Sequence, residues 1–248
     1  MEHRARLGIS RIALVSGLIV VVAVAGLAVY LAVVPPGPSK STTSTSEATS
    51  TQSASLVVGL RPPSPLIAPG QTQNYSSIEL QTLGSGLNGT LAIIGFSPPG
   101  ISLLLNKSSV SLANDPQSIR LGLKADTGLT PGKYNFSLET SSADLPARNQ
   151  TFTIDVVPVL VIIQSEAFHP QNITVHAGTP VSWINLDSTI GCCDPGNHNV
   201  VFLSGANGSS PILKQFDSWS YQFGTPGVVE YYCSIHPLIM KGQVTVTA

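Results

Sequence analysis

The sequence predicts an all-β protein in which two β-sandwich domains follow an N-terminal transmembrane helix. One uninterrupted apolar run lies near the N-terminus, and beyond it no stretch repeats its apolar residues with a helical period. Charged residues make up only 10% of the chain, against roughly 25% in an average soluble protein. Short apolar stretches alternate with turns rich in Gly and Pro, and this pattern favours strands.

The apolar run extends from Ile12 to Val34 and contains 23 residues without a charge. As a helix it would be about 35 Å long, enough to cross a hydrocarbon core of about 30 Å. Arg4, Arg6 and Arg11 precede the run, so residues 1–11 are expected in the cytoplasm and the later domains outside the cell membrane. The alternative is a cleaved signal peptide, whose apolar region usually has only about 7–15 residues. Either interpretation exports the remaining chain.

Residues 35–55 are rich in Pro, then in Ser, Thr and Ala, and predict a flexible linker because they offer little apolar surface to pack. Residues 56–158 and 159–248 each have the length and turn spacing of one sandwich. The strands expected in the first domain include 91–96, 119–123, 134–138 and 152–157. The seven strands expected in the second are 159–163, 172–175, 181–185, 198–203, 219–223, 228–233 and 243–247.

The first domain resembles the immunoglobulin-like modules of surface proteins, through the runs Ala-Pro-Gly-Gln-Thr at 68–72 and Pro-Gly-Lys-Tyr-Asn-Phe at 131–136. It contains no Cys and no His, so we expect it to be a spacer or packing partner. The exported part of the chain also carries Asn-x-Ser/Thr sequons, which predict surface glycosylation in a host that modifies asparagine. These sequons are at Asn74, Asn88, Asn106, Asn135, Asn149, Asn172 and Asn207.

A cluster of potential metal ligands lies near the end of the chain, where Cys233, His236 and Met240 fall within eight residues. A thiolate, an imidazole and a thioether suit a copper ion that changes oxidation state, provided that a second imidazole joins them. His198 is the expected supplier, because it begins one predicted strand while Cys233 ends another. The alternatives are an ordinary buried thiol at Cys233 and a simple core residue at Met240.

Four stretches of the second domain, in this order, resemble a cupredoxin, a type 1 blue copper protein of the plastocyanin and amicyanin kind. The stretches are Phe-His-Pro at 168–170, residues 172–187, His-Asn-Val-Val-Phe at 198–202, and the run from Cys233 to Met240. The resemblance implies a Greek-key sandwich that holds one copper ion through His198, Cys233, His236 and Met240. Met240 would be a long, weak axial ligand, and Asn199 would hydrogen-bond the thiolate and brace the ligand loop.

The expected function is that of a membrane-anchored carrier of single electrons between a donor and an acceptor protein that dock weakly. Pro237 and Leu238 form an apolar rim beside His236 and are candidate electron ports, because exposed apolar patches serve as docking sites. Family analogy makes Tyr232 a second candidate port. A net charge of −1 without a basic stripe gives no reason to expect nucleic acid as a partner.

Residue counts weigh against other functions. A multicopper oxidase would need a further cluster of histidines, whereas the chain has five in all, so we expect no enzyme. A copper-storage or delivery protein would usually display more methionines than the two present. An adhesion protein with a vestigial copper domain is the other alternative, and such a domain would be expected to have lost some ligands.

The remaining cysteines, two further histidines and Trp183 lie in the second domain. Cys192 and Cys193 lie in an insert directly before His198, and they could form a vicinal disulfide or remain free thiols. We hypothesise that one of them adds a metal contact or a redox switch. His169 and His176 are expected to be surface or structural residues, and Trp183 is expected in the core.

Overall fold

The structure of the protein is a computed structural model, and it describes residues 55–83, 89–112, 116–143, 145–188 and 196–248. Every regular element in these ranges is a β-strand, so the all-β prediction is confirmed for the described part of the chain. The same residues include no helix that is long and apolar enough to cross a membrane. The predicted transmembrane segment 12–34, nearly all of the linker, Asn88, Cys192 and Cys193 lie outside the described residues.

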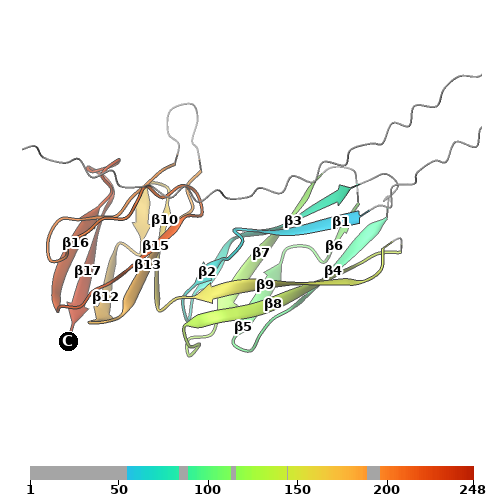
Figure 1. Cartoon of the computed structure of the whole chain (residues 1–248), viewed down its shortest axis with the longest axis horizontal. Helices are drawn as coiled ribbons and strands as arrows, with labels where there is room; N and C mark the ends of the chain where they lie inside the picture. The colour runs from blue at the N-terminus through green and yellow to red at the C-terminus, as the bar shows by residue number, and fades with distance from the viewer. Residues whose placement is uncertain (1–54, 84–88, 113–115, 144, 189–195) are drawn as a thin grey trace, which may run out of the picture. The chain divides into compact units, whose positions relative to one another are not determined.

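The strands between residues 55 and 156 form two sheets (Figure 1). One sheet is antiparallel throughout, in the order β1 (Ser55–Arg61), β3 (Thr72–Leu83), β7 (Gln117–Ala125), β5 (Ile101–Leu105). The other has the order β2 (Leu66–Ile67), β9 (Arg148–Val156), β8 (Gly132–Ser141), β4 (Thr90–Phe96), β6 (Ser109–Ser111). Alternate side chains of both sheets share one buried cluster, including Ile78 and Leu121 from the first and Leu138 and Ile154 from the second.

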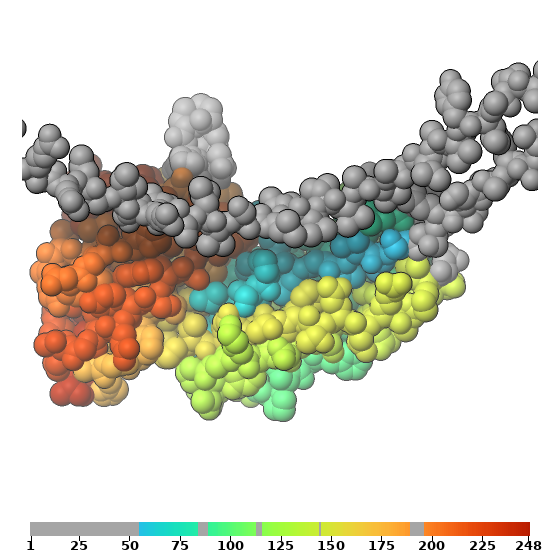
Figure 2. Space-filling view, in the orientation of Figure 1, coloured from blue at the N-terminus to red at the C-terminus, as the bar shows by residue number. Residues whose placement is uncertain are grey.

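The two sheets approach each other along one side of this first region, where β1 lies beside β9. Figure 2 shows the blue surface of β1 next to the yellow surface of β9, although the strands are far apart in the sequence. Leu56 and Val58 of β1 and Arg148 and Gln150 of β9 line a shallow recess between them. The buried faces of the sheets are therefore enclosed on this side by neighbouring edge strands.

The strands between residues 159 and 247 form two further sheets, which carry the candidate site (Figure 1). One has the order β11 (Ala167–His169), β10 (Val159–Gln164), β13 (Pro180–Asn185), β15 (Ser218–Gln222). The other has the order β12 (Asn172–His176), β17 (Lys241–Thr247), β16 (Gly227–Tyr232), β14 (Val201–Phe202). The pairs β10–β13 and β12–β17 are parallel, and the remaining pairs are antiparallel.

Aromatic side chains fill the space between these two sheets. Trp183 is fully buried, as expected, and its ring centroid lies 5.6 Å from that of Tyr231 in an edge-on arrangement and 5.4 Å from that of Trp219. Such edge-on pairs stabilise a core beyond the apolar area that they bury. Gly242 is needed next to Tyr231, because a Cβ atom at this position would overlap the tyrosine ring.

The strand predicted at 198–203 is shorter in the structure. Only Val201–Phe202 pairs as a strand, while His198 forms an isolated bridge with Leu213. The reason is that Val200 turns its backbone to Ser210: its N–H donates to the Ser210 hydroxyl at 2.9 Å, and its carbonyl accepts the Ser210 N–H at 2.9 Å. The neighbour of His198 is therefore an irregular segment and not a sheet strand.

Two smaller differences concern residues near the ends of strands. His169, predicted in a turn, is the last residue of β11, a strand that the sequence analysis did not include. Cys233, predicted to end a strand, lies one residue beyond β16, which ends at Tyr232. Neither difference changes which residues lie at the end of the sandwich that carries His198 and Cys233.

Candidate metal centre

Strand pairing brings His198 close to Cys233, although 35 residues separate them. Val201 and Phe202 of β14 pair with Tyr232 and Tyr231 of β16, so the chain before Val201 runs alongside the chain after Tyr232. His198 is fixed on its other side by Leu213, with N–H···O distances of 3.1 and 2.7 Å between the two backbones. The imidazole is thus held by a doubly hydrogen-bonded backbone at the end of a sheet.

The loop from Cys233 to Met240 is closed by hydrogen bonds of its own backbone. Cys233 N–H donates to the Met240 carbonyl at 3.1 Å, and this bond joins the two ends of the loop. His236 N–H donates to the Cys233 carbonyl at 3.2 Å, and Met240 N–H donates to the His236 carbonyl at 3.0 Å. These bonds fix the positions from which Cys233, His236 and Met240 extend their side chains.

Three donor atoms converge in this pocket of the fold. The Sγ atom of Cys233 lies 3.8 Å from Nδ1 of His198 and 3.9 Å from Nδ1 of His236, and the three ligand atoms all lie within 4.8 Å of one another. A sulfur at about 2.3 Å and a nitrogen at about 2.0 Å from one ion, about 120° apart, would be separated by about 3.7 Å. The sulfur–nitrogen distances therefore fit one metal ion with trigonal ligands.

Met240 is the fourth residue of the predicted set. Its side chain is buried and belongs to the same apolar cluster as Cys233. Two imidazoles and a thiolate with a nearby thioether are the donors of a type 1 copper site. His198, Cys233, His236 and Met240 have this arrangement.

The surroundings of Cys233 favour the thiolate form that binds metal. Burial by itself raises the pKa of the thiol, but hydrogen bonds with His198 and with the backbones of Asn199, His236 and Ile235 lower it by more. The resulting pKa is about 6, below the ordinary value of 9.0. Cys233 is therefore largely ionised at neutral pH even before a metal binds.

The pKa of His198 shifts in the opposite direction to that of Cys233. Burial lowers the pKa of its imidazole, whereas the hydrogen bonds and charges of Cys233 and Asp187 raise it, and the net direction is upward. The neighbouring anions thus outweigh the loss of solvent around the ring. In the metal-free protein, His198 and Cys233 form a mutually stabilising pair.

Asn199 acts on the ligand loop through both its backbone and its side chain. Its backbone is one of the groups that stabilise the Cys233 thiolate. Its Oδ1 accepts the Ser234 N–H at 2.8 Å, and its Nδ2 donates to the Ser234 hydroxyl at 2.9 Å. Asn199 thus contacts the ligand loop through its side chain and acts on the thiolate through its backbone.

Asp187 is a member of the site that the sequence analysis missed. Its Oδ2 lies 3.0 Å from Nε2 of His198, on the side of the ring opposite Cys233. The only signal in the sequence is a pair of polar residues, Asn185 at the end of the predicted strand 181–185 and Asp187 two residues later. Burial shows that both face inward.

The candidate electron ports differ in exposure. Leu238 is 87% exposed and Ile239 61%, and together with exposed Pro237 they follow half-buried His236 directly in the chain. Tyr232 is half-buried at the end of β16. Exposed apolar residues thus follow one ligand in the loop, while the tyrosine directly precedes the ligand Cys233.

The remaining histidines do not join this cluster. His169 is exposed and its Nε2 lies 3.2 Å from the Gln164 carbonyl, while exposed His176 has its Nδ1 3.1 Å from the Ala248 carbonyl. Among the described residues the one group of metal-ligating His, Cys, Asp or Glu side chains is His198, Cys233 and His236. Cys192 and Cys193 cannot be placed against it because they lie outside the described residues.

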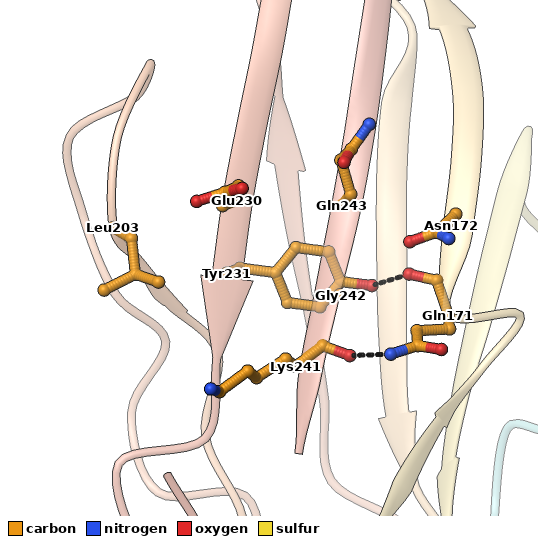
Figure 3. A pocket seen from close by; sticks show the side chains of 8 residues that line it. All are labelled: Gln171, Asn172, Leu203, Glu230, Tyr231, Lys241, Gly242 and Gln243. Atoms are coloured by element: carbon orange, nitrogen blue, oxygen red, sulfur yellow. Dashed lines mark hydrogen bonds between the residues drawn. The ribbon is translucent and has the colours of Figure 1, made fainter. Parts of the chain in front are cut away.

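A polar recess of about 360 Å³ lies over β16 and β17 and contains none of the metal donors. Figure 3 shows the hydroxyl of Tyr231 reaching between strands to the Gln171 carbonyl, and the Gln171 amide donating to the Lys241 carbonyl. These contacts join the segment before β12 to β17. The recess thus belongs to the packing of the sheet and not to the candidate centre.

Comparisons with known proteins match the same part of the chain. Residues 159–247 match the family model of copper-binding proteins of the plastocyanin/azurin family. Amicyanin-alpha of Methylorubrum extorquens is 32% identical over 90 residues, which cover 35% of this chain and 69% of that protein. Plastocyanin of Scenedesmus fuscus is 32% identical over 90 residues, which cover 32% of this chain and 85% of the plastocyanin.

Among solved structures, an amicyanin variant with a methionine-to-alanine substitution and Cu(I) is 28% identical to this chain. The match covers 36% of this chain and 81% of the amicyanin chain, with a TM-score of 0.31. The family model includes all four residues of the candidate centre, His198, Cys233, His236 and Met240.

Proposed function

Because the chain belongs, through residues 159–247, to the plastocyanin/azurin family of copper-binding proteins, we propose that it carries single electrons between redox partners. The observation that carries this proposal is the convergence of His198, Cys233 and His236 at the spacing of one ion. Met240 is buried in the same apolar cluster as Cys233. Copper bound there would supply the one-electron oxidation and reduction. The protein supplies donors of fixed position.

The fixed donors matter because fast electron transfer requires little movement of the ligands between oxidation states. The backbone of His198 is held by Leu213, and the loop of Cys233 is closed by its bond to Met240. Full burial of Cys233 and His198 keeps water from their donor atoms. Rigid support of this kind is what a functional metal site needs from its surroundings.

We propose that the protein carries electrons and does not catalyse a reaction. Within the described residues a single cluster of metal-ligating side chains is present, and the two other described histidines lie on the surface. We propose that electrons pass through the exposed edge of His236, with Pro237 and Leu238 as the docking rim and Tyr232 as a second port. Partners would dock weakly, through a small and largely apolar contact.

The rest of the chain is proposed to place this centre outside a membrane. Residues 12–34 would anchor the protein, 35–55 would act as a tether, and 56–158 would form an immunoglobulin-like spacer. The two sheets found between residues 55 and 156 are compatible with such a spacer. Cell fractionation tests the anchor: the mature chain should retain residues 1–34 and require detergent for release. A mature chain beginning near residue 35 would support the signal peptide instead.

The proposed function is tested by adding Cu(II) to the purified full-length chain. We expect one copper per chain and an intense thiolate-to-copper absorption band in the visible range, which a reductant bleaches and an oxidant restores. Cys233→Ser is the matched control and should lose the band. Bound copper without this band would contradict the carrier function, and several coppers per chain would favour storage or delivery.

A further inference from the structure

A buried carboxylate lies directly behind one of the copper-binding imidazoles. Asp187 is only 7% exposed, and its two oxygens receive three hydrogen bonds from residues that the structure describes. Oδ1 accepts the Ser165 N–H at 2.6 Å, and Oδ2 accepts the Glu166 N–H at 3.0 Å and lies 3.0 Å from Nε2 of His198. A buried charged group requires such partners, and here one of the three is a metal ligand.

The turn that holds this carboxylate has an unusual backbone. Ser165 and Glu166 connect β10 to β11 as a two-residue hairpin, with Gln164 paired to Ala167. Their φ angles are +54° and +55°, a combination that usually selects Asn-Gly because other side chains are disfavoured there. In this conformation both amide groups point to Asp187. By accepting both N–H groups, the Asp187 carboxylate stabilises a turn conformation that Ser and Glu do not favour by themselves.

A second side chain ties the same strand end to the backbone of His198. Asn185 accepts the Asp187 N–H at 2.9 Å and donates to the Leu213 carbonyl at 2.9 Å. Leu213 is the residue that bridges to His198 through two backbone hydrogen bonds. Asn185 therefore orients the backbone around His198, whereas Asp187 contacts the ring itself.

From these contacts we propose that Asp187 is a positioning residue that fixes the His198 ring and lowers the reduction potential of the copper. The inference rests on the proposed function. With Nε2 donating to Asp187, the ring presents Nδ1 to the ion in a single orientation. A carboxylate hydrogen-bonded to a metal-bound imidazole raises the basicity of that ligand. A more basic ligand and a nearby negative charge both favour Cu(II), which carries one more positive charge than Cu(I).

The test compares Asp187→Asn with Glu230→Gln in the copper-loaded, full-length chain. Both variants remove one negative charge, but Glu230 is exposed on β16 and touches no metal ligand in the contacts described. The measurements are the reduction potential, the separate affinities for Cu(II) and Cu(I), and the thermal unfolding of the metal-free chain.

Asp187→Asn should lower the ratio of the Cu(II) affinity to the Cu(I) affinity by about tenfold or more. Each tenfold decrease of this ratio raises the reduction potential by about 59 mV. Glu230→Gln should change the ratio by less than about twofold, since a solvated charge is screened. An equal loss of both affinities in Asp187→Asn, with an unchanged potential, would reduce Asp187 to a structural residue and overturn the inference.

If Asp187→Asn does not fold, a measurement on the unsubstituted protein tests whether Asp187 contacts the His198 ring. In the Cu(I) protein, the Nε2 proton of His198 should show nuclear Overhauser effects to the amide protons of Ser165 and Glu166, because all three converge on one carboxylate. Absence of these effects would overturn the inference. Failure of the unsubstituted chain to develop the thiolate-to-copper band would instead defeat the proposed function, so the two failures are distinguishable.

Discussion

At the scale of single residues, the centre depends on how burial and hydrogen bonding act on Cys233. Burial alone would keep this thiol protonated, yet His198 and three backbone groups hold its pKa at about 6. A structural cysteine in an apolar core has no such partners and stays inert. The donor is therefore prepared for metal before the ion arrives.

The lowered pKa makes the stability of the metal-free protein depend on pH. The thiolate form stabilises the fold fully above the ordinary thiol pKa of 9.0, and this contribution is lost as pH falls through about 6. We expect the ultraviolet thiolate absorbance of the metal-free chain, after subtraction of that of Cys233→Ser, to titrate with a midpoint at about 6. The subtraction removes the signals of Cys192 and Cys193. A midpoint close to 9.0 would contradict the structure.

Met240 is the ligand whose contribution can be separated from simple packing. Met240→Leu conserves volume and should change the free energy of unfolding by less than about 1.5 kcal/mol. The visible band should persist because Cys233 and both histidines remain. The reduction potential should rise, because a weak donor that favours Cu(II) is lost. Leu160→Met, a volume-conserving exchange at another buried position, is the control. An unchanged potential in Met240→Leu would identify Met240 as a core residue only.

At the scale of elements, the site is made where a short strand, an irregular bridge and one loop meet. β14 contributes only Val201–Phe202, and His198 is fixed by Leu213 outside any strand. The ligand loop is attached to this segment by Asn199, which reaches Ser234 from the residue next to His198. The histidine segment and the loop therefore keep one relative position.

Removing this link should loosen the loop without removing a ligand. Asn199→Ala leaves the Ser234 N–H without its partner and should cost on the order of 1 kcal/mol of folding free energy. The visible band should remain, because the backbone of Asn199 still stabilises the thiolate. Copper transfer to a strong chelator, followed by loss of the band, should be faster. Ser234→Ala keeps the backbone hydrogen bond and should show a smaller effect. Equal chelator rates for all three proteins would exclude the bracing role.

The sequence predicted the ligands better than it predicted their support. Cys233, His236 and Met240 are recognisable because chemical type and spacing coincide within one loop, and His198 follows from the need for a second imidazole. Asp187 could not be recognised, because its role depends on the Ser165–Glu166 turn, which meets it only in the folded chain. The strand at 198–203 was predicted too long for the same reason, since Ser210 captures the backbone of Val200.

In the first region, strands with regular apolar alternation were predicted and others were missed. β4 alternates buried and exposed side chains from Leu91 onward, and its run of apolar residues was found from the sequence. β3 is not among the runs named from the sequence, because polar residues such as Gln73 and Ser76 occupy buried positions, where they hydrogen-bond each other at 3.2 Å. Such mutual satisfaction of polar groups cannot be seen in a hydrophobic pattern.

At the scale of the whole molecule, charge and apolar surface determine how the protein would meet its partners. Residues 159–248 contain five acidic side chains against Lys214 and Lys241, so electrostatic steering is modest. The apolar rim at the copper end includes Leu238, which is 87% exposed. Contact through this rim would place His236 between the copper and the partner.

Electron self-exchange between two copies of the copper-loaded protein tests this rim without a known partner. Leu238→Ser should slow self-exchange, measured by NMR line broadening in mixtures of reduced and oxidised protein, by about fivefold or more. This corresponds to the loss of about 1 kcal/mol at the contact. The reduction potential should not change, because Leu238 is not a ligand. Val228→Ser removes an apolar side chain of β16 that is 51% exposed, and it should leave the rate unchanged. If both variants slowed exchange equally, or neither did, electrons would not enter through the rim around His236, and Tyr232 would become the port to test next.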